Sequence, residues 1–363
     1  MARMGNDIPR YMCLLDHDML PHPAIMSHSV NCLQKDDNKA FIQYPQRFYD
    51  ITGVDLLYAG NEIFFDGVQA NRSKAGLTAF AGTNAVWNLQ ALYHVGGFQY
   101  GSLTEDASTG LAVHITGYTS TYSSRELAVG QSPQTVKDAM QQRMRWSQGA
   151  IEIGMNHAKA ILCRRSAIMD VELPKQLAEE FPATRPKKPS FRKTLEMAII
   201  YFDAMIYPFY SMGYLLHVAV CGLYLYSIEA PIAPSDPIQF LYYWLPLYIV
   251  KAACQVIAFP QVSLTAQWNS QMAWAGYSLS TLVSIKNALL PSLGGGGWFN
   301  TGAGTKEKFL IQVRELRNSS FRYSSPLILL PCSFSVRKHC RSRWDLRHGY
   351  LPRLCVHPGR QDV

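Results

Sequence analysis

Short apolar blocks separated by polar residues along the first 163 residues predict an α/β domain. The apolar stretches RYMCLLDHDM (10–19), AFIQYP (40–45), LTAFAGTNAVW (77–87) and STYSSRELAV (120–129) are typical of strands. Helical patterns lie between them, for example EDASTGLAVHITG (105–117), where Gly117 suits the end of a helix. Strands that alternate with helices favour a doubly wound, mostly parallel sheet over residues 1–163.

A long helix is predicted to begin at Ser132 and Pro133 and to run to about Cys163, because serine is a good N-cap and proline suits the first helical position. On such a helix Gln142, Arg145 and Trp146 stand at positions i, i+3 and i+4 and therefore share one face. Arg143 lies to the side of this face, and we assign it no role.

The pattern changes after residue 163. Residues 164–205 combine a basic, proline-containing linker with an amphipathic stretch that is typical of an interfacial helix. Residues 206–228 contain no Lys, Arg, Asp or Glu. As a helix they would reach about 34 Å, enough to cross a bilayer core of about 30 Å. We expect transmembrane or interfacial helices over residues 206–293; a large buried helical core is the alternative.

Composition and charge agree with a protein that is partly embedded in a membrane. Charged residues make up 17% of the chain, against about 25% in an average protein. The formal net charge is +8, and the basic residues stand mainly beside the apolar segments and in the tail, residues 311–363, which we expect to be poorly ordered. An anionic membrane face explains this placement, so we expect no nucleic-acid partner. We expect a multi-pass membrane protein with its amino-terminal domain facing the cytoplasm.

Three short motifs carry candidate chemistry. Asp16 and Asp18 follow an apolar run, and side chains at i and i+2 of an extended chain point to the same side, where two carboxylates can share a divalent cation. In TED, Thr104 can cap a helix with Glu105 and Asp106 in its first turn, or one of the acids can act as a general base. The third motif is Gln142, Arg145 and Trp146. Its arginine can hold a pyrophosphate through paired hydrogen bonds, and its tryptophan can stack against a sugar. Each motif also has an ordinary structural explanation. Asp16 and Asp18 could belong to a turn, TED could be the start of a capped helix, and the third motif could be a helix that a packed tryptophan holds in place.

The order DxD, TED, QxxRW and then apolar segments resembles the processive family 2 glycosyltransferases, specifically the cellulose synthase-like membrane enzymes. Residues 81–85 (AGTNA), 43–50 (QYPQRFYD) and 298–308 (WFNTGAGTKEK) resemble further stretches of that family, including its gating loop in residues 294–310. The resemblance covers roughly residues 8–310. A transporter or channel would leave the three motifs unexplained.

The resemblance implies a GT-A-like fold and inverting transfer of sugar from a UDP-sugar to a growing β-glycan. Asp106 would be the general base in the catalytic triplet with Thr104 and Glu105. The binding roles implied are a Mg²⁺ or Mn²⁺ site at Asp16 and Asp18, a nucleotide and pyrophosphate site at Gln142, Arg145, Thr305 and Lys306, and an acceptor site at Trp146, Gly82 and Thr83.

The chain also departs from the family pattern. Only 15 residues precede Asp16, and the gating-loop stretch is interrupted between Asn300 and Thr305. We interpret the sequence as an amino-terminally truncated chain whose sheet is incomplete at that end. The expected partners are the UDP-sugar, the growing glycan, the lipid bilayer and further subunits of a synthase complex. The alternative function is a non-catalytic paralogue or subunit of such a complex.

Overall fold

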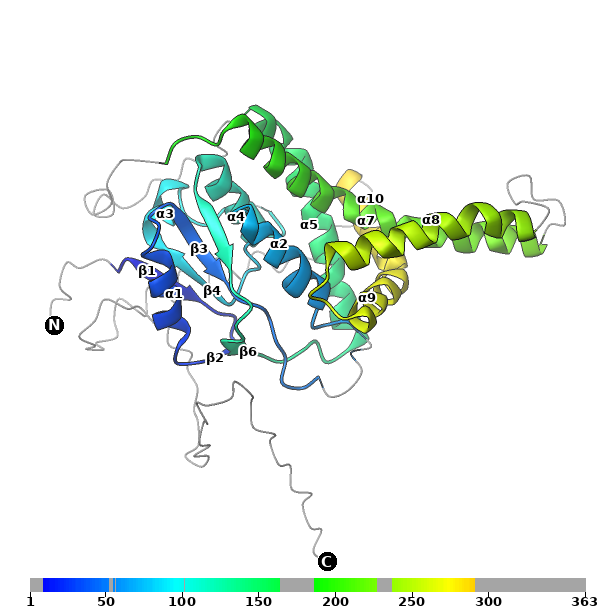
Figure 1. The fold of residues 1–363 in the computed structure, drawn as a ribbon, viewed down its shortest axis with the longest axis horizontal. Coiled ribbons are helices and arrows are strands. Elements are labelled where there is room, and N and C mark those ends of the chain that lie inside the picture. The colour runs from blue at the N-terminus through cyan, green and yellow to red at the C-terminus, as the bar shows by residue number, and fades with distance from the viewer. Residues whose placement is uncertain are drawn as a thin grey trace, which may run out of the picture. The chain divides into compact units, whose positions relative to one another are not determined.

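A four-stranded sheet in the order β1-β4-β3-β5 forms the centre of the α/β region (Figure 1). The computed structural model describes residues 9–51, 55, 57–100, 102–163, 186–226 and 237–290, and these belong to one unit, residues 1–330. The strands are β1 (Tyr11–Leu14), β3 (Lys39–Gln43), β4 (Ala85–Asn88) and β5 (Thr119–Tyr122). A second, two-stranded sheet pairs β2 (Leu20–Pro21) with β6 (Ala128–Val129).

The sheet is mixed, so the predicted mostly parallel pairing is wrong. β4 pairs antiparallel with both β1 and β3, and only β3 and β5 pair in parallel. All four residues of β4 are buried, and a fully buried strand has the same apolar pattern in either direction. The reversal has a consequence for the site: Ala85 lies beside both Leu14 and Gln43, so the start of β4 meets the ends of β1 and β3.

Helices cover both faces of the sheet, as an α/β architecture requires. On one face Phe41 and Trp87 pack against α3 (Leu89–His94) and α4 (Glu105–Thr116). On the other face Ile42 and Val86 pack against α1 (Ile25–Leu33). Neighbouring residues of a strand point to opposite faces, which is why the pairs 41/42 and 86/87 divide between the two cores.

Helix ends agree with the sequence where the capping chemistry is local. α4 spans Glu105–Thr116 and ends at Gly117, whose φ of 108° lies in the left-handed region. The long helix α5 (Val136–Cys163) begins later than predicted. Thr135 and Asp138 bond reciprocally at its start, whereas Ser132 donates from its backbone N–H and its hydroxyl to Asp50.

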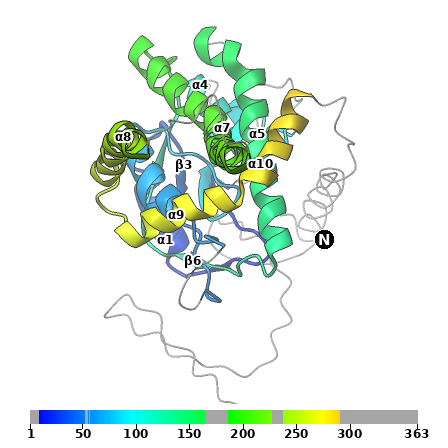
Figure 2. The same cartoon turned by 90° about the vertical axis from the view of Figure 1, so that its right-hand side faces the viewer.

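The remaining helical segments are two short ones before β4 and a group after α5, and the group after α5 forms a second region. A π-helical segment η1 (Ile63–Gln69) continues into α2 (Ala70–Lys74). α7 (Phe191–Tyr226) runs without interruption across residues 205 and 206, where an interfacial helix was expected to give way to a spanning one. α8 (Pro237–Ala258), α9 (Leu264–Gly276) and α10 (Ser278–Leu289) follow, and α5 packs against α7 and α10 (Figure 2).

Of the helices in the described ranges, none has the combined length and apolar character needed to cross a membrane. The membrane region expected within residues 206–293 stays a prediction. The gating-loop-like segment and the tail lie outside the described residues.

Candidate active site

The reversed strand β4 brings the first motif and the AGTNA turn together. Asp16 follows β1, and its backbone N–H donates to Thr83 Oγ1 at 2.8 Å. Thr83 is fully buried in the turn that leads into β4. Two segments that are 67 residues apart therefore meet at one edge of the sheet.

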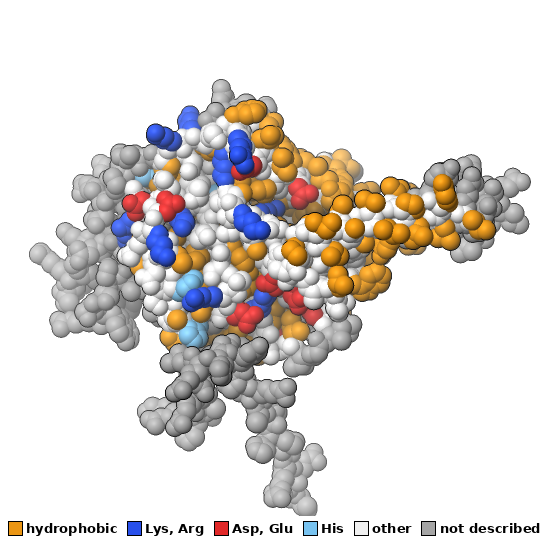
Figure 3. Space-filling model, viewed as in Figure 1, with side chains coloured by type: hydrophobic (Ala, Val, Ile, Leu, Met, Phe, Trp, Pro, Cys, Tyr) orange, Lys and Arg blue, Asp and Glu red, His pale blue; other side chains and the backbone are white. Residues whose placement is uncertain are grey.

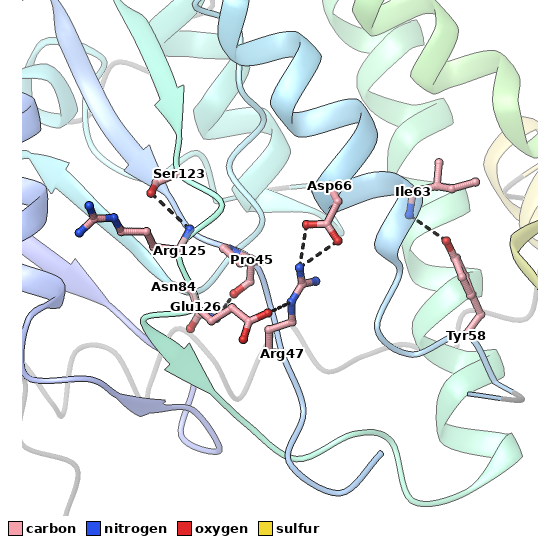
Figure 4. Close-up of polar contacts among 9 residues, drawn as sticks. All are labelled: Pro45, Arg47, Tyr58, Ile63, Asp66, Asn84, Ser123, Arg125 and Glu126. Carbon is pink, nitrogen blue, oxygen red and sulfur yellow. Dashed lines mark hydrogen bonds and ion pairs between the residues drawn. The ribbon is translucent and has the colours of Figure 1, made fainter. Parts of the chain in front are cut away.

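A buried glutamine supports this turn. Gln43 at the end of β3 donates from Nε2 to the carbonyl oxygen of Thr83 at 2.7 Å and accepts from the N–H of Ala81 at 3.0 Å. Asn84 Nδ2 donates to the carbonyl oxygen of Pro45 at 3.0 Å (Figure 4). Gly82 has a φ of 82°, and a Cβ added there would lie 3.1 Å from Asp106 Oδ2. Glycine thus permits both the turn and its close approach to α4.

The TED motif forms the start of α4, but Thr104 does not cap it with its side chain. Thr104 occupies the N-cap position without a side-chain capping bond, and its buried hydroxyl has no hydrogen-bond partner among the described residues. The hydroxyl lies against Gly149 of α5, where an added Cβ would collide with it. Tertiary packing of α4 on α5 has overridden the local capping preference.

Charge at this edge is dominated by carboxylates. Burial, together with the charges of Glu105 and Asp16, raises the pKa of Asp106 to about 7, opposed by the Ala107 N–H and by Arg145. Asp16 keeps contact with solvent, but the protein atoms packed around its carboxyl group and the charge of Asp18 raise its pKa to about 6. A carboxyl group with a pKa near 7 is suited to accept a proton at neutral pH.

The excess of negative charge also bears on a metal ion. No group of three or more His, Cys, Asp or Glu side chains in the described ranges gathers closely enough to ligate a metal by itself. Mg²⁺ is commonly held by one or two carboxylates together with substrate phosphates. The oxygen donors of Asp16 and Asp18, whose mutual repulsion contributes to the raised pKa of Asp16, fit such a site.

The third motif lies on α5. Arg145 is exposed, and its positive charge lowers the pKa values of both Asp16 and Asp106. Gln142 and Trp146 are partly buried on the same helix. The structure therefore brings Asp16, Asp18, Glu105, Asp106 and Arg145 into one electrostatic neighbourhood, whereas Thr305 and Lys306 lie outside the described residues.

Arg143 is the residue that sequence reasoning missed. Its side chain is buried, and its guanidinium lies 4.6 Å from the ring centroid of Trp146, 5.7 Å from that of Trp274 and 5.8 Å from that of Tyr277. Nη2 donates to the carbonyl oxygen of Tyr58 at 2.6 Å. The i+3 spacing to Trp146 was visible in the sequence, but the other two rings come from α9 and the residue that follows it.

Further bonds reinforce the joint around Arg143. Tyr277 donates from its hydroxyl to the carbonyl oxygen of Leu57 at 2.8 Å, and Ser284 of α10 donates to the carbonyl oxygen of Met144 at 3.0 Å. Tyr58 accepts from the N–H of Ile63 at 2.8 Å, at the start of η1 (Figure 4). The helix that carries the third motif is thus tied to α9, α10 and the segment before η1.

Arg47 joins the segments beyond β3. It donates to both carboxylate oxygens of Asp66, at 2.7 and 2.9 Å, and to Glu126 at 2.9 Å (Figure 4). The Arg47 and Asp66 side chains are 21% and 25% exposed, so this bidentate pair is partly shielded from water. It links η1 to the residues before β6, beside the AGTNA turn.

Comparisons with known proteins identify the family of the chain. The family described as "Glycosyl transferase family group 2" matches residues 11–260. The chain is 40% identical over 146 residues to a UDP-forming cellulose synthase catalytic subunit of Dictyostelium discoideum, which covers 39% of this chain and 14% of that protein. It is 30% identical over 151 residues to the UDP-forming cellulose synthase 1 catalytic subunit of Komagataeibacter xylinus, which covers 39% of this chain and 20% of that protein.

A plant protein extends the similarity. The chain is 25% identical over 203 residues to putative cellulose synthase-like protein D5 of Oryza sativa subsp. indica, covering 55% of this chain and 18% of that protein. The matched stretches thus span a fifth or less of these three relatives' own length. Because the family match extends over more than half of the sequence, from β1 through α8, the chain belongs to glycosyl transferase family group 2 and is cellulose synthase-like.

Proposed function

We propose that this chain is a membrane-bound processive glycosyltransferase that moves a sugar from a UDP-sugar to a hydroxyl of a growing β-glycan, with inversion. The observation that carries the proposal is the cluster of Asp16, Asp106 and Arg145 at one edge of the sheet, with the pKa of Asp106 raised to about 7. Family membership and the UDP-forming relatives support the same reaction.

Asp106 is the proposed general base. Its Oδ1 accepts the N–H of Ala107 at 2.7 Å, and its Oδ2 faces Gly82 of the AGTNA turn. In the proposed step the acceptor hydroxyl gives its proton to the Asp106 carboxylate as its oxygen bonds to C1 of the donor sugar. The bond from C1 to the diphosphate oxygen breaks, and UDP leaves with that electron pair. Glu105 and Thr104 position Asp106 through α4, and Gly82 and Thr83 border the acceptor.

The leaving group needs positive charge. Arg145, with Gln142, is the proposed pyrophosphate-binding pair, since an arginine fork matches phosphate oxygens. Asp16 and Asp18 would hold Mg²⁺ or Mn²⁺, which when bound offsets the negative charge of the diphosphate. Trp146 is the proposed floor for the acceptor sugar, with one partner, Arg143, already packed on its ring.

Exposed apolar side chains support the membrane part of the proposal. Of the 30 exposed large hydrophobic side chains in the described residues, 25 lie between residues 191 and 290. Figure 3 shows such side chains gathered over α7 and α8. A soluble monomer rarely exposes so much contiguous apolar surface. We propose that this region contacts lipid and that the α/β region faces the cytoplasm.

Asp106→Asn tests the chemistry, and Glu105→Gln, which removes a positioning carboxylate but not the proposed base, is the matched comparison and should reduce transfer less. Both variants lose one carboxylate from the first turn of α4, but only the first removes the proposed base. With radiolabelled UDP-sugar and reconstituted full chain, we expect Asp106→Asn to reduce transfer by about 10²–10⁴-fold, the usual contribution of a general base. UDP binding should remain within about twofold. Unchanged transfer would rule out this role for Asp106.

The same assay distinguishes an active transferase from the alternative function, a non-catalytic subunit of a synthase complex. A chain that binds no UDP, transfers no sugar and copurifies with an active synthase would be a non-catalytic subunit. Trp146→Ala then tests the acceptor floor: we expect shorter glycan products and nearly unchanged UDP binding. Loss of UDP binding with normal product length would place Trp146 in the nucleotide site instead.

A further inference from the structure

A polar hollow of about 440 Å³ lies between α1, β3 and β5, and it shares no residue with the carboxylate edge. His28, Cys32 and Lys35 line it from α1 and the turn that follows, at spacings of four and three residues that place them on one side. β3 contributes Lys39 and Ile42. The end of β5 and the loop after it, residues 121–125, complete the lining.

The lining carries positive charge without acids. Lys35, Lys39 and Arg125 line the hollow, and no Asp or Glu does. None of the three cations forms an ion pair with a described residue, in contrast to Arg10 and Arg47, which each have a carboxylate partner. Burial, followed by the charges of Arg125 and Lys35, lowers the pKa of His28, in keeping with two cations near this imidazole.

A hydrogen-bond chain beneath the hollow orients His28. The hydroxyl of Ser29 donates to the carbonyl oxygen of Ile25 at 2.6 Å, because a carbonyl can only accept. Ser29 has no second proton, so Tyr44 donates to Ser29 at 2.7 Å. His28 Nδ1 must then donate to the Tyr44 oxygen at 2.7 Å. The imidazole is thereby held in the Nδ1–H form, with Nε2 left for another contact.

Hydroxyl groups complete the donor set. Thr121, Ser123 and Ser124 line the hollow beside Arg125. Ser123 Oγ accepts the backbone N–H of Arg125 at 3.4 Å, a bond within the loop after β5 (Figure 4). On the face shown in Figure 3, Lys, Arg and His side chains lie over α1, with acidic side chains beside them.

We propose that this hollow binds a small molecule through its phosphate groups. Lysine and arginine are the side chains that recognise phosphate, hydroxyl groups add hydrogen bonds, and three unpaired cations match the charge of a diphosphate. A volume of about 440 Å³ lies within the range of small-molecule sites, about 300–1,000 Å³, which leaves room for a small phosphorylated molecule. The site is separate from the proposed transfer reaction and does not depend on it.

The test is calorimetric titration of the full chain with inorganic diphosphate and, separately, with ATP. Every protein carries Arg145→Ala, so that the proposed pyrophosphate site is weakened equally in all of them. The test variant replaces Lys35, Lys39 and Arg125 with Gln. The matched control replaces three exposed lysines elsewhere with Gln: Lys137, Lys187 and Lys188. Both variants change the net charge equally, and thermal melts verify that both are folded.

We expect the test variant to bind diphosphate at least tenfold more weakly, and the control to stay within twofold of the parent. Tighter binding of ATP than of diphosphate would identify a nucleotide, and equal binding would identify the phosphate groups as the whole determinant. No binding by the parent at millimolar diphosphate, an unaffected test variant, or an equal loss in the control would each overturn the proposal.

Discussion

The α/β region and the helices α7 to α10 use apolar side chains in opposite ways. In the α/β region Trp87, Tyr44 and Phe41 are fully buried between sheet and helices. In the helical region Leu216, Leu247 and Ile257 are each more than 60% exposed. The comparison teaches that the first region buries its large apolar side chains in its own core, whereas the second leaves many of its large apolar side chains exposed, which is the observation behind the proposed contact with lipid.

Helix α5 packs against both regions, and Arg143 and Arg145 of this helix differ in the same respect, because one is buried and the other is exposed. Arg143 is buried among rings contributed partly by α9 and the residue after it, while Arg145 is exposed and acts on the acids of the sheet edge. Arg145 thus lies near the acids of the candidate site, whereas Arg143 contacts the second region. The following predictions test this division.

The largest expected effect concerns the apolar surface of α8. Replacing Leu241, Leu245, Leu247, Ile249 and Ile257 with Ser removes exposed apolar area from this helix. Because each such side chain contributes about 1.5–3 kcal/mol on leaving water, binding to lipid vesicles should fall by at least about 10³-fold. Flotation with vesicles measures the bound fraction.

The control makes the same change at the five exposed large hydrophobic residues of the α/β region: Leu20, Tyr49, Val136, Met155 and Leu162. Since these residues are scattered over β2, loops and α5, we expect vesicle binding to change by less than about threefold. Equal losses in the two variants would abolish the distinction between the regions.

Tryptophan truncation should affect the folding stability of only one region. Trp87 is fully buried, so Trp87→Ala is expected to lower the free energy of unfolding by about 3–5 kcal/mol. Trp268 of α9 is 54% exposed, and Trp268→Ala should cost less than about 1 kcal/mol. Denaturant unfolding of both variants gives the comparison, and similar losses would contradict it.

The two arginines of α5 should separate stability from binding. Arg143→Ala removes three ring contacts and the bond to the Tyr58 carbonyl, for an expected loss of about 2–4 kcal/mol. Arg145→Ala removes an exposed charge, so stability should change by less than about 0.5 kcal/mol while UDP binding weakens. Thermal melts measure the stability of both variants, and titration with UDP measures their binding. If Arg143→Ala mainly weakened UDP binding and Arg145→Ala mainly lowered stability, the two roles would have to be exchanged.

A pH dependence of stability is expected where α4, β5 and α7 meet. The buried His114 ring is hydrogen-bonded to the Tyr201 hydroxyl at 3.0 Å and to the Ser120 hydroxyl at 2.8 Å. Burial, together with the charges of Lys193 and Arg72, lowers the pKa of His114 to about 3. The unfolded chain binds this proton below about pH 6.5 and the folded chain does not. The contribution of neutral His114 to the free energy of unfolding is therefore complete above pH 6.5 and is lost as the pH falls toward 3.

Unfolding measured between pH 7 and pH 4 tests this expectation. His114→Gln should flatten the acid side of the stability profile, and the exposed His17→Gln should leave it unchanged. A profile that keeps its full slope in His114→Gln would assign the proton uptake to another group.

The sequence by itself predicted the local elements and the order of the motifs. The end of α4 at Gly117, the acids in its first turn and the strand within residues 40–45 all depend on neighbouring residues, whose spacing is visible in a single chain. Where the local signal was ambiguous, the prediction was wrong. Ser132 has the residue type of an N-cap, but its hydroxyl donates to Asp50, 82 residues away, and Thr135 accepts the Asp138 N–H at the start of α5.

Only the tertiary structure decided how the motifs meet. The antiparallel direction of β4 places Thr83 against Asp16, and a buried strand has the same apolar pattern whichever way it runs. Arg143 acquired its partners from residues 274 and 277, more than 120 positions along the chain. Spacing along a helix reports which side chains share a face, but what lies opposite that face depends on how distant elements pack.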